Sequence, residues 1–147
     1  MLHISVDCDP LLKSPKKKYV KSLITKTLKE KNISDCDISV IFGKDELLSE
    51  LKKEFFNKDQ LTDVIAFRLN DYSLSQLEGE VYISLPRAKE NSEIYNQPYA
   101  KEISRLIIHG CLHLLGFDDD TRVSKKKMTE LENKYLNTFD FYKIFED

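Results

Sequence analysis

The chain has little of what marks membrane, secreted or disulfide-stabilised proteins. No apolar run approaches the roughly 20 residues that span a bilayer, so we expect no contact with a membrane. The first residues lack a basic stretch followed by an apolar one, which argues against a secretory signal. The three cysteines, Cys8, Cys36 and Cys111, are odd in number and include no CxxC pair. They predict buried, reduced thiols in a cytoplasmic protein.

Basic and acidic residues are nearly balanced in number. The formal net charge is −2 and the pI about 6.0, which argues mildly against a protein that coats nucleic acid without specificity. This balance leaves room for an enzyme that acts on a nucleic acid through a local basic groove. The 147 residues contain no repeat, low-complexity segment or linker, so we expect one domain over 1–147, with a monomer as the favoured state.

Apolar patterning predicts alternating strands and helices. Strands are expected over 2–6, 37–42, 64–69 and 79–85, and helices over 15–28, 45–55, 87–93, 99–115 and 121–137. These elements predict an α+β fold in which a small mixed four-stranded sheet packs with about five helices, in two or three layers. The helix over 99–115 is apolar on most sides, so we expect it to be buried at the centre.

The end of this central helix carries the most informative pattern. His109 and His113 stand four residues apart and are followed by Gly116 and by three consecutive aspartates at 118–120. Residues at this spacing lie on one helix face, roughly 6 Å apart along the axis, and two imidazoles so placed can bind one metal ion. The glycine ends the helix, and the chain can then fold back to offer a carboxylate as the third ligand. Spacing alone does not choose among the three aspartates, one of which can instead serve as helix N-terminal charge.

A coincidental histidine pair is the alternative to a metal site. The helix is apolar, however, and the only other histidine is His3, which we expect to be structural or solvated. Three protein ligands would leave one coordination position open, as in catalytic sites. A metallopeptidase is weakly supported, because the glutamate of HExxH is replaced by Gly110. A metal-activated water, whose pKa falls from 15.7 towards ~7, suits phosphodiester hydrolysis, and the residues alone identify no proton-transferring side chain.

Four segments of the chain resemble one known family. HGCLHLLGFDDD, over 109–120, resembles the HGxLHLxGYDH motif of the YbeY family of metal-dependent endoribonucleases. DQLTDVIAF over 59–67 resembles that family's KDxPTDVLSF stretch, and GEVYIS over 79–84 resembles its GDIxIS strand. Residues 128–132 resemble its C-terminal helix, so the resemblance covers nearly the whole chain.

The resemblance implies a function. It implies a cytoplasmic, zinc-dependent, single-strand-specific endoribonuclease acting in 16S rRNA maturation and ribosome quality control. Its partners would be ribosomal RNA and the small ribosomal subunit. By position, the family's first two histidine ligands fall on His109 and His113, and the third falls on Asp119. One zinc ion per chain is therefore expected, and the carboxylate ligand leaves another divalent metal such as iron(II) possible.

Besides Asp119, which stands where the family has a histidine, the chain departs from the family at Phe56. The family has an arginine there, in a YRGKD-like segment, and an arginine can steady a phosphate or its transition-state charge. Phenylalanine cannot, so either another cation replaces it or activity is reduced. The candidate cations are Lys58, Arg68, Arg87 and Arg105. Phe56 could instead stack on an unpaired base of single-stranded RNA.

Other readings of the sequence stay open. The lysine runs at 16–18 and 125–127 are typical of solvated helix faces, or of an RNA footprint if they share a surface. The protein could be a ribosome-associated factor with a mainly structural metal. It could also be a metallohydrolase of another phosphoester.

Overall fold

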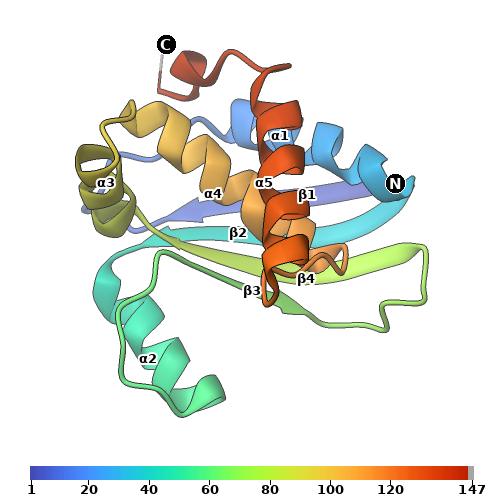
Figure 1. Ribbon diagram of the computed structural model, residues 1–147, viewed down its shortest axis with the longest axis horizontal. Helices are drawn as coiled ribbons and strands as arrows, with labels where there is room; N and C mark the ends of the chain where they lie inside the picture. The colour runs from blue at the N-terminus through green and yellow to red at the C-terminus, as the bar shows by residue number, and fades with distance from the viewer. Residues whose placement is uncertain (146–147) are drawn as a thin grey trace.

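A computed structural model of the chain describes residues 1–145 and confirms the predicted α+β class (Figure 1). Within these residues it has four strands, five α-helices and two short 3-10 helices. The elements, in chain order, are β1 (Leu2–Cys8), α1 (Lys17–Leu28), η1 (Lys29–Lys31), β2 (Asp35–Gly43), α2 (Asp45–Phe56), β3 (Val64–Arg68), β4 (Gln76–Ser84), α3 (Leu85–Ile94), α4 (Tyr99–Leu114), α5 (Arg122–Leu136) and η2 (Phe141–Ile144).

The four strands form one mixed sheet in the order β1-β2-β4-β3. β1 and β2 are parallel, as are β2 and β4, whereas β3 runs antiparallel to β4. Along β2, Ile38, Val40 and Phe42 are fully buried, while Ser39 and Ile41 between them are only half-buried. This period of two shows that one face of the sheet carries the main core.

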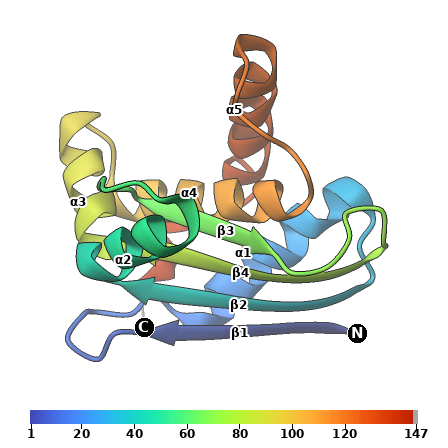
Figure 2. The ribbon, with the colours of Figure 1, turned by 90° about the horizontal axis from the view of Figure 1, so that it is seen from below.

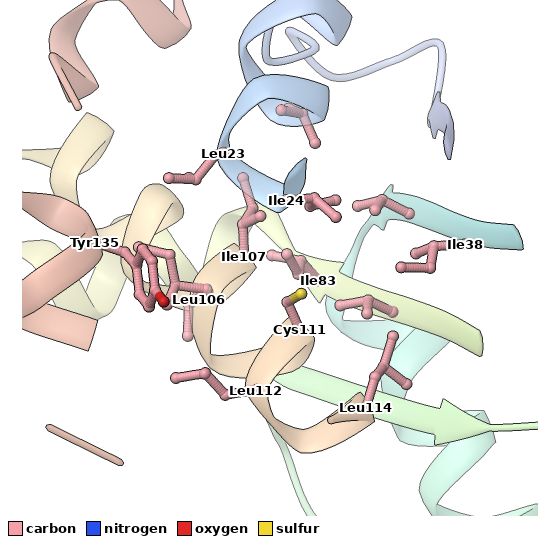
Figure 3. Packing of buried hydrophobic residues seen from close by; sticks show 14 of the residues in the cluster. Leu23, Ile24, Ile38, Ile83, Leu106, Ile107, Cys111, Leu112, Leu114 and Tyr135 are labelled. Carbon is pink, nitrogen blue, oxygen red and sulfur yellow. The ribbon is translucent and has the colours of Figure 1, made fainter. Parts of the chain in front are cut away.

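Helices α1 and α4 cover that face. Figure 3 shows Leu23 and Ile24 of α1 meeting Ile107 of α4 above Ile38 and Ile83 of the sheet. Helix α2 covers only part of the opposite face, where its two terminal phenylalanines contact the β3–β4 region. Helix α5 stands on the far side of α4 from the sheet (Figure 2). The arrangement thus has two main layers with α2 as a partial third.

Helix α4 is the buried central helix that the sequence predicts. It packs closely on β4 at Gly110, where an added Cβ would lie 2.6 Å from Cγ1 of Val81. Glycine is therefore needed at this position for the backbone of the helix to approach the strand. This close approach fixes the height of the two neighbouring histidines above the sheet.

Some local predictions need correction. Helix α1 begins at Lys17, two residues after the predicted start. Val123, which the apolar pattern places inward, is 80% exposed because it lies roughly 140° around α5 from the buried Met128. Cys36 and Cys111 are buried free thiols, whereas Cys8 is only half-buried. Across residues 1–145, no helix combines the length and apolarity needed to cross a membrane.

Candidate metal centre

Three predicted ligand side chains converge at the end of α4. The Nε2 atoms of His109 and His113 lie 3.0 Å apart. The carboxylate of Asp119 reaches both, with Oδ2 3.6 Å from His109 Nε2 and Oδ1 3.8 Å from His113 Nε2. In the described part of the chain, this is the one group of at least three His, Cys, Asp or Glu residues placed to hold a metal ion. Of the three aspartates, only Asp119 has its carboxylate within 4.0 Å of ring nitrogens of both histidines.

A tight turn brings Asp119 back to the helix. Gly116 has a φ of +99°, the left-handed conformation that ends helices and that glycine adopts without strain. Its N–H donates to the carbonyl of His113, and the N–H of Phe117 donates to the carbonyl of Leu112, both at 3.0 Å. These two bonds form a Schellman motif, which reverses the chain within a few residues.

The spacing of these atoms fits a metal ion. Two atoms that each bond a tetrahedral zinc at about 2.0–2.1 Å lie roughly 3.3 Å apart, and the three observed separations bracket that value. Two imidazoles and one carboxylate form a donor set found in zinc hydrolases and in iron(II) enzymes. The side chains of His109, His113 and Asp119 are 15%, 31% and 39% exposed, so the cluster opens to solvent on one side.

A fourth residue, Glu132 of α5, orients the first histidine. Its Oε2 lies 2.6 Å from Nδ1 of His109, and its side chain is only 6% exposed. A buried carboxylate accepts a hydrogen bond from the Nδ1–H group, which directs the Nε2 lone pair of His109 towards His113 and Asp119. Sequence reasoning missed Glu132. A signal was present, since Glu132 occupies the inward face of α5 beside Leu131.

Arg105 balances the charge of this carboxylate. Its guanidinium makes two 2.8 Å hydrogen bonds to Glu102 and lies 3.4 Å from Glu132. The hydrogen bonds to Glu102 raise the pKa of Arg105, so its positive charge is permanent. The guanidinium thus places a positive charge beside the buried carboxylate of Glu132.

His113 is held in the neutral form. Burial lowers the pKa of His113, and the neighbouring His109 lowers it further, while Asp119 partly opposes the shift. A metal-binding imidazole must be unprotonated. The fold therefore prepares His113 for a ligand role near neutral pH.

Two clefts meet at this cluster. His113 lines a cleft of about 580 Å³, and His109 with Asp119 lines a second of about 230 Å³. Val64 of β3 lines both, so the clefts adjoin across the cluster. Chain-like substrates could thus pass on both sides of a bound ion.

The three arginines proposed to replace the family's arginine already have partners, and of the three only Arg105 lines one of the two clefts, the second. Arg68 donates hydrogen bonds to backbone carbonyl oxygens. Arg87 forms ion pairs with Asp45 and Glu90. Arg105 forms ion pairs with Glu102 and Glu132. Lys58, the fourth candidate, lines neither cleft. Of the two lysine runs, only the second contributes to a cleft: Lys125 lines the second cleft, and the lysines at 16–18 line neither. His3 is exposed on the edge strand β1.

Phe56 lines the larger cleft, together with a cation that the sequence analysis did not single out. This cation is Lys52, one helical turn earlier on α2. Its Nζ lies 4.6 Å from the centroid of the Phe56 ring. The i, i+4 spacing of a lysine and an aromatic residue was the signal that could have revealed the pair.

The chain is similar to known proteins of one family. The family model described as Endoribonuclease YbeY matches residues 8–140. Endoribonuclease YbeY of Flavobacterium psychrophilum is 35% identical over 117 residues, covering 79% of this chain and 81% of that protein. The protein of the same name from Persephonella marina is 39% identical over 107 residues, covering 71% of this chain and 70% of its own.

A solved structure shares the fold. The solution structure of a Thermotoga maritima protein superimposes with a TM-score of 0.61 at 27% identity, covering 93% of this chain and 87% of that one. The family match spans most of the sequence, including the histidines of α4 and the turn to Asp119. The chain therefore belongs to the YbeY endoribonuclease family.

Proposed function

We propose that this protein hydrolyses phosphodiester bonds within single-stranded RNA by means of a metal-activated water. His109, His113 and Asp119 would hold the metal, with one zinc ion per chain and iron(II) as the alternative. The observation that carries the proposal is the meeting of these three side chains where two clefts adjoin, in a member of an endoribonuclease family.

The chain's own residues prepare the site for this reaction. When bound, a divalent metal would lower the pKa of a water and polarise a phosphoryl oxygen. Glu132 holds the His109 ring in one orientation and tautomer, and the guanidinium of Arg105 lies beside Glu132. The adjoining clefts leave room for the strand on both sides of the scissile bond, as cleavage within a chain requires.

The biological setting follows from the family resemblance. We propose 16S rRNA maturation and ribosome quality control in the cytoplasm, with ribosomal RNA and the small subunit as partners. The free thiols of the three cysteines suit a reducing compartment. We further propose that residues 1–147 act as one domain and one monomer.

A ribosome-associated factor with a structural metal is a less favoured candidate. A structural zinc site is closed by protein ligands, whereas His113 and Asp119 are about a third exposed, at 31% and 39%, and face a cleft. The two candidates differ in what metal removal does, because a structural metal contributes directly to folding.

Chelation followed by two readouts tests the proposal. We expect the metal-free protein to keep its far-ultraviolet circular dichroism spectrum and to lose cleavage of a single-stranded oligoribonucleotide, with activity restored by zinc. Duplex RNA of the same sequence should resist cleavage. Unfolding on chelation would favour the structural-metal factor. Turnover of a model phosphodiester without RNA cleavage would favour a different phosphoesterase.

A further inference from the structure

The larger cleft differs from the metal centre in its chemistry. Besides His113, three aromatic rings line it, those of Phe56, Tyr72 and Phe117. Phe56 and Tyr72 are 43% and 59% exposed, so both rings are accessible to a ligand in the cleft. The volume of about 580 Å³ lies within the roughly 300–1,000 Å³ of small-molecule sites. The cleft is therefore large enough for one nucleotide.

The Phe56 ring is supported by a stack of aromatic rings that ends on the sheet. It stacks on Phe67 of β3 with ring centroids 5.9 Å apart and planes 18° from parallel. Phe67 in turn makes an edge contact with Tyr82 of β4, so the stack rests on the sheet. A ring held in this way loses little conformational entropy when a flat ligand stacks on it.

Lys52 is the only Lys or Arg among the described residues that line this cleft. It takes part in none of the ion pairs found in residues 1–145, and its ammonium group lies against the Phe56 ring. At a partly exposed site, a cation–π contact contributes roughly the same free energy as an exposed ion pair. A phosphate can therefore draw the Lys52 ammonium group away from the ring. Asp118 and Asp120 line the part of the cleft beside the metal turn, which confines phosphate binding to the Lys52 side.

We propose that Lys52 and Phe56 together form a nucleotide-binding site for single-stranded RNA next to the scissile bond. Phe56 stacks on one unpaired base, and Lys52 moves from the ring to the adjoining phosphate. This proposal rests on the proposed ribonuclease function and assigns the role of the family's missing arginine to a pair of residues. A base within a duplex is already stacked on both sides, so the pair also selects for unpaired RNA.

Matched variants test the pair by fluorescence-anisotropy binding of a single-stranded oligoribonucleotide. Phe55 is the control for Phe56, because it also packs on Phe67, at 5.2 Å, but does not line the cleft. We expect Phe56→Leu to weaken binding about ten-fold, Phe55→Leu to leave it within two-fold, and Phe56→Trp to retain it. The same oligonucleotide with an abasic site beside the cleavage position should bind wild type and Phe56→Leu equally.

The lysine is tested through the salt dependence of binding. Lys53 is the control for Lys52, because it lies on the same helix and its Nζ faces Asp59 at 3.6 Å. We expect Lys52→Met to reduce the slope of log affinity against log salt by about 0.7, with Lys52→Arg restoring it and Lys53→Met having a smaller effect.

The outcomes separate this inference from the function it rests on. If wild type cleaves RNA but Phe56→Leu behaves like Phe55→Leu, and Lys52→Met like Lys53→Met, the nucleotide site is overturned and the ribonuclease proposal stands. If wild type neither binds nor cleaves RNA while holding its metal, the proposed function fails and the nucleotide site fails with it. The retained affinity of Phe56→Trp guards against an effect of folding alone.

Discussion

Glu132 Oε2 and His109 Nδ1 lie 2.6 Å apart although 23 residues separate them in the chain. The contact joins α5 to α4 at the point where the candidate metal ligands begin. It turns a histidine that could adopt either tautomer into one whose Nε2 lone pair faces the other two ligands. The last helix therefore serves the site as well as the core.

Glu132→Gln tests this orienting role. The amide keeps the size of the side chain but loses the charge that holds the Nδ1 proton. We expect zinc affinity, measured by competition with a chromophoric chelator, to fall about 10- to 100-fold while the far-ultraviolet spectrum is unchanged. Glu130→Gln, an exposed position on the same helix, is the control and should leave affinity unaltered. Equal affinities for wild type and Glu132→Gln would remove Glu132 from the site.

Gly110→Ala tests the close approach of α4 to the sheet. Alanine favours a helix by about 1 kcal/mol over glycine, but overpacking costs about 1–3 kcal/mol. The added Cβ would lie 2.6 Å from Val81, which is 2% exposed in an inner strand and cannot move away. We expect a net loss of up to about 2 kcal/mol in the free energy of unfolding by urea, together with weaker metal binding.

The same contact predicts that the effect of Gly110→Ala on stability depends on the side chain at position 81. Val81→Ala removes the methyl groups that the new Cβ would meet. In that background we expect Gly110→Ala to be neutral or stabilising, as the helix preference alone dictates. If Gly110→Ala destabilises both backgrounds equally, the packing explanation for this glycine is wrong.

Glu30 gives a prediction for pH. The Tyr135 hydroxyl donates to its carboxylate at 2.6 Å and Lys134 Nζ donates at 3.0 Å. The hydrogen bond from Tyr135, aided by Lys134, lowers the pKa of Glu30 below its usual value of 4.5. A lowered pKa in the folded state means that the stabilisation is present above pH 4.5 and is lost as the pH falls through the folded-state pKa.

Glu30→Gln measures this contribution. At pH 7 we expect the variant to be about 1 kcal/mol less stable than wild type, and the difference should shrink as the pH falls below about 4.5. Urea unfolding at several pH values provides the check. A difference that stays constant from pH 7 to pH 3 would mean that the carboxylate charge contributes nothing.

The sequence was most informative where local spacing carries the chemistry. The histidines at 109 and 113 share a helix face by the geometry of the helix alone, and Gly116 predicts the turn that follows. The aspartate could not be chosen from spacing, because all three candidates follow the turn within reach. The family resemblance pointed to Asp119, and the fold brings that carboxylate to the histidines.

The residues that were missed belong to contacts between distant elements. Glu132 acts across two helices, and its burial becomes visible only once α5 packs on α4. In the sequence, Lys52 is one of two adjacent lysines on an amphipathic helix, and its place in the cleft becomes visible only when α2 is placed beside β3. Arg68, Arg87 and Arg105 each have one partner that is distant in sequence, namely Leu114, Asp45 and Glu132, and such a partner cannot be seen in a linear pattern.

Metal content of the aspartate variants tests the central claim most directly. Wild type, Asp119→Ala and Asp118→Ala would be purified in parallel and examined by elemental analysis, with RNA cleavage assayed on the same samples. We predict about one zinc per chain in wild type and in Asp118→Ala, and loss of both metal and cleavage in Asp119→Ala alone. An Asp119→Ala variant that keeps its metal and its cleavage would contradict the three-ligand centre on which this account depends.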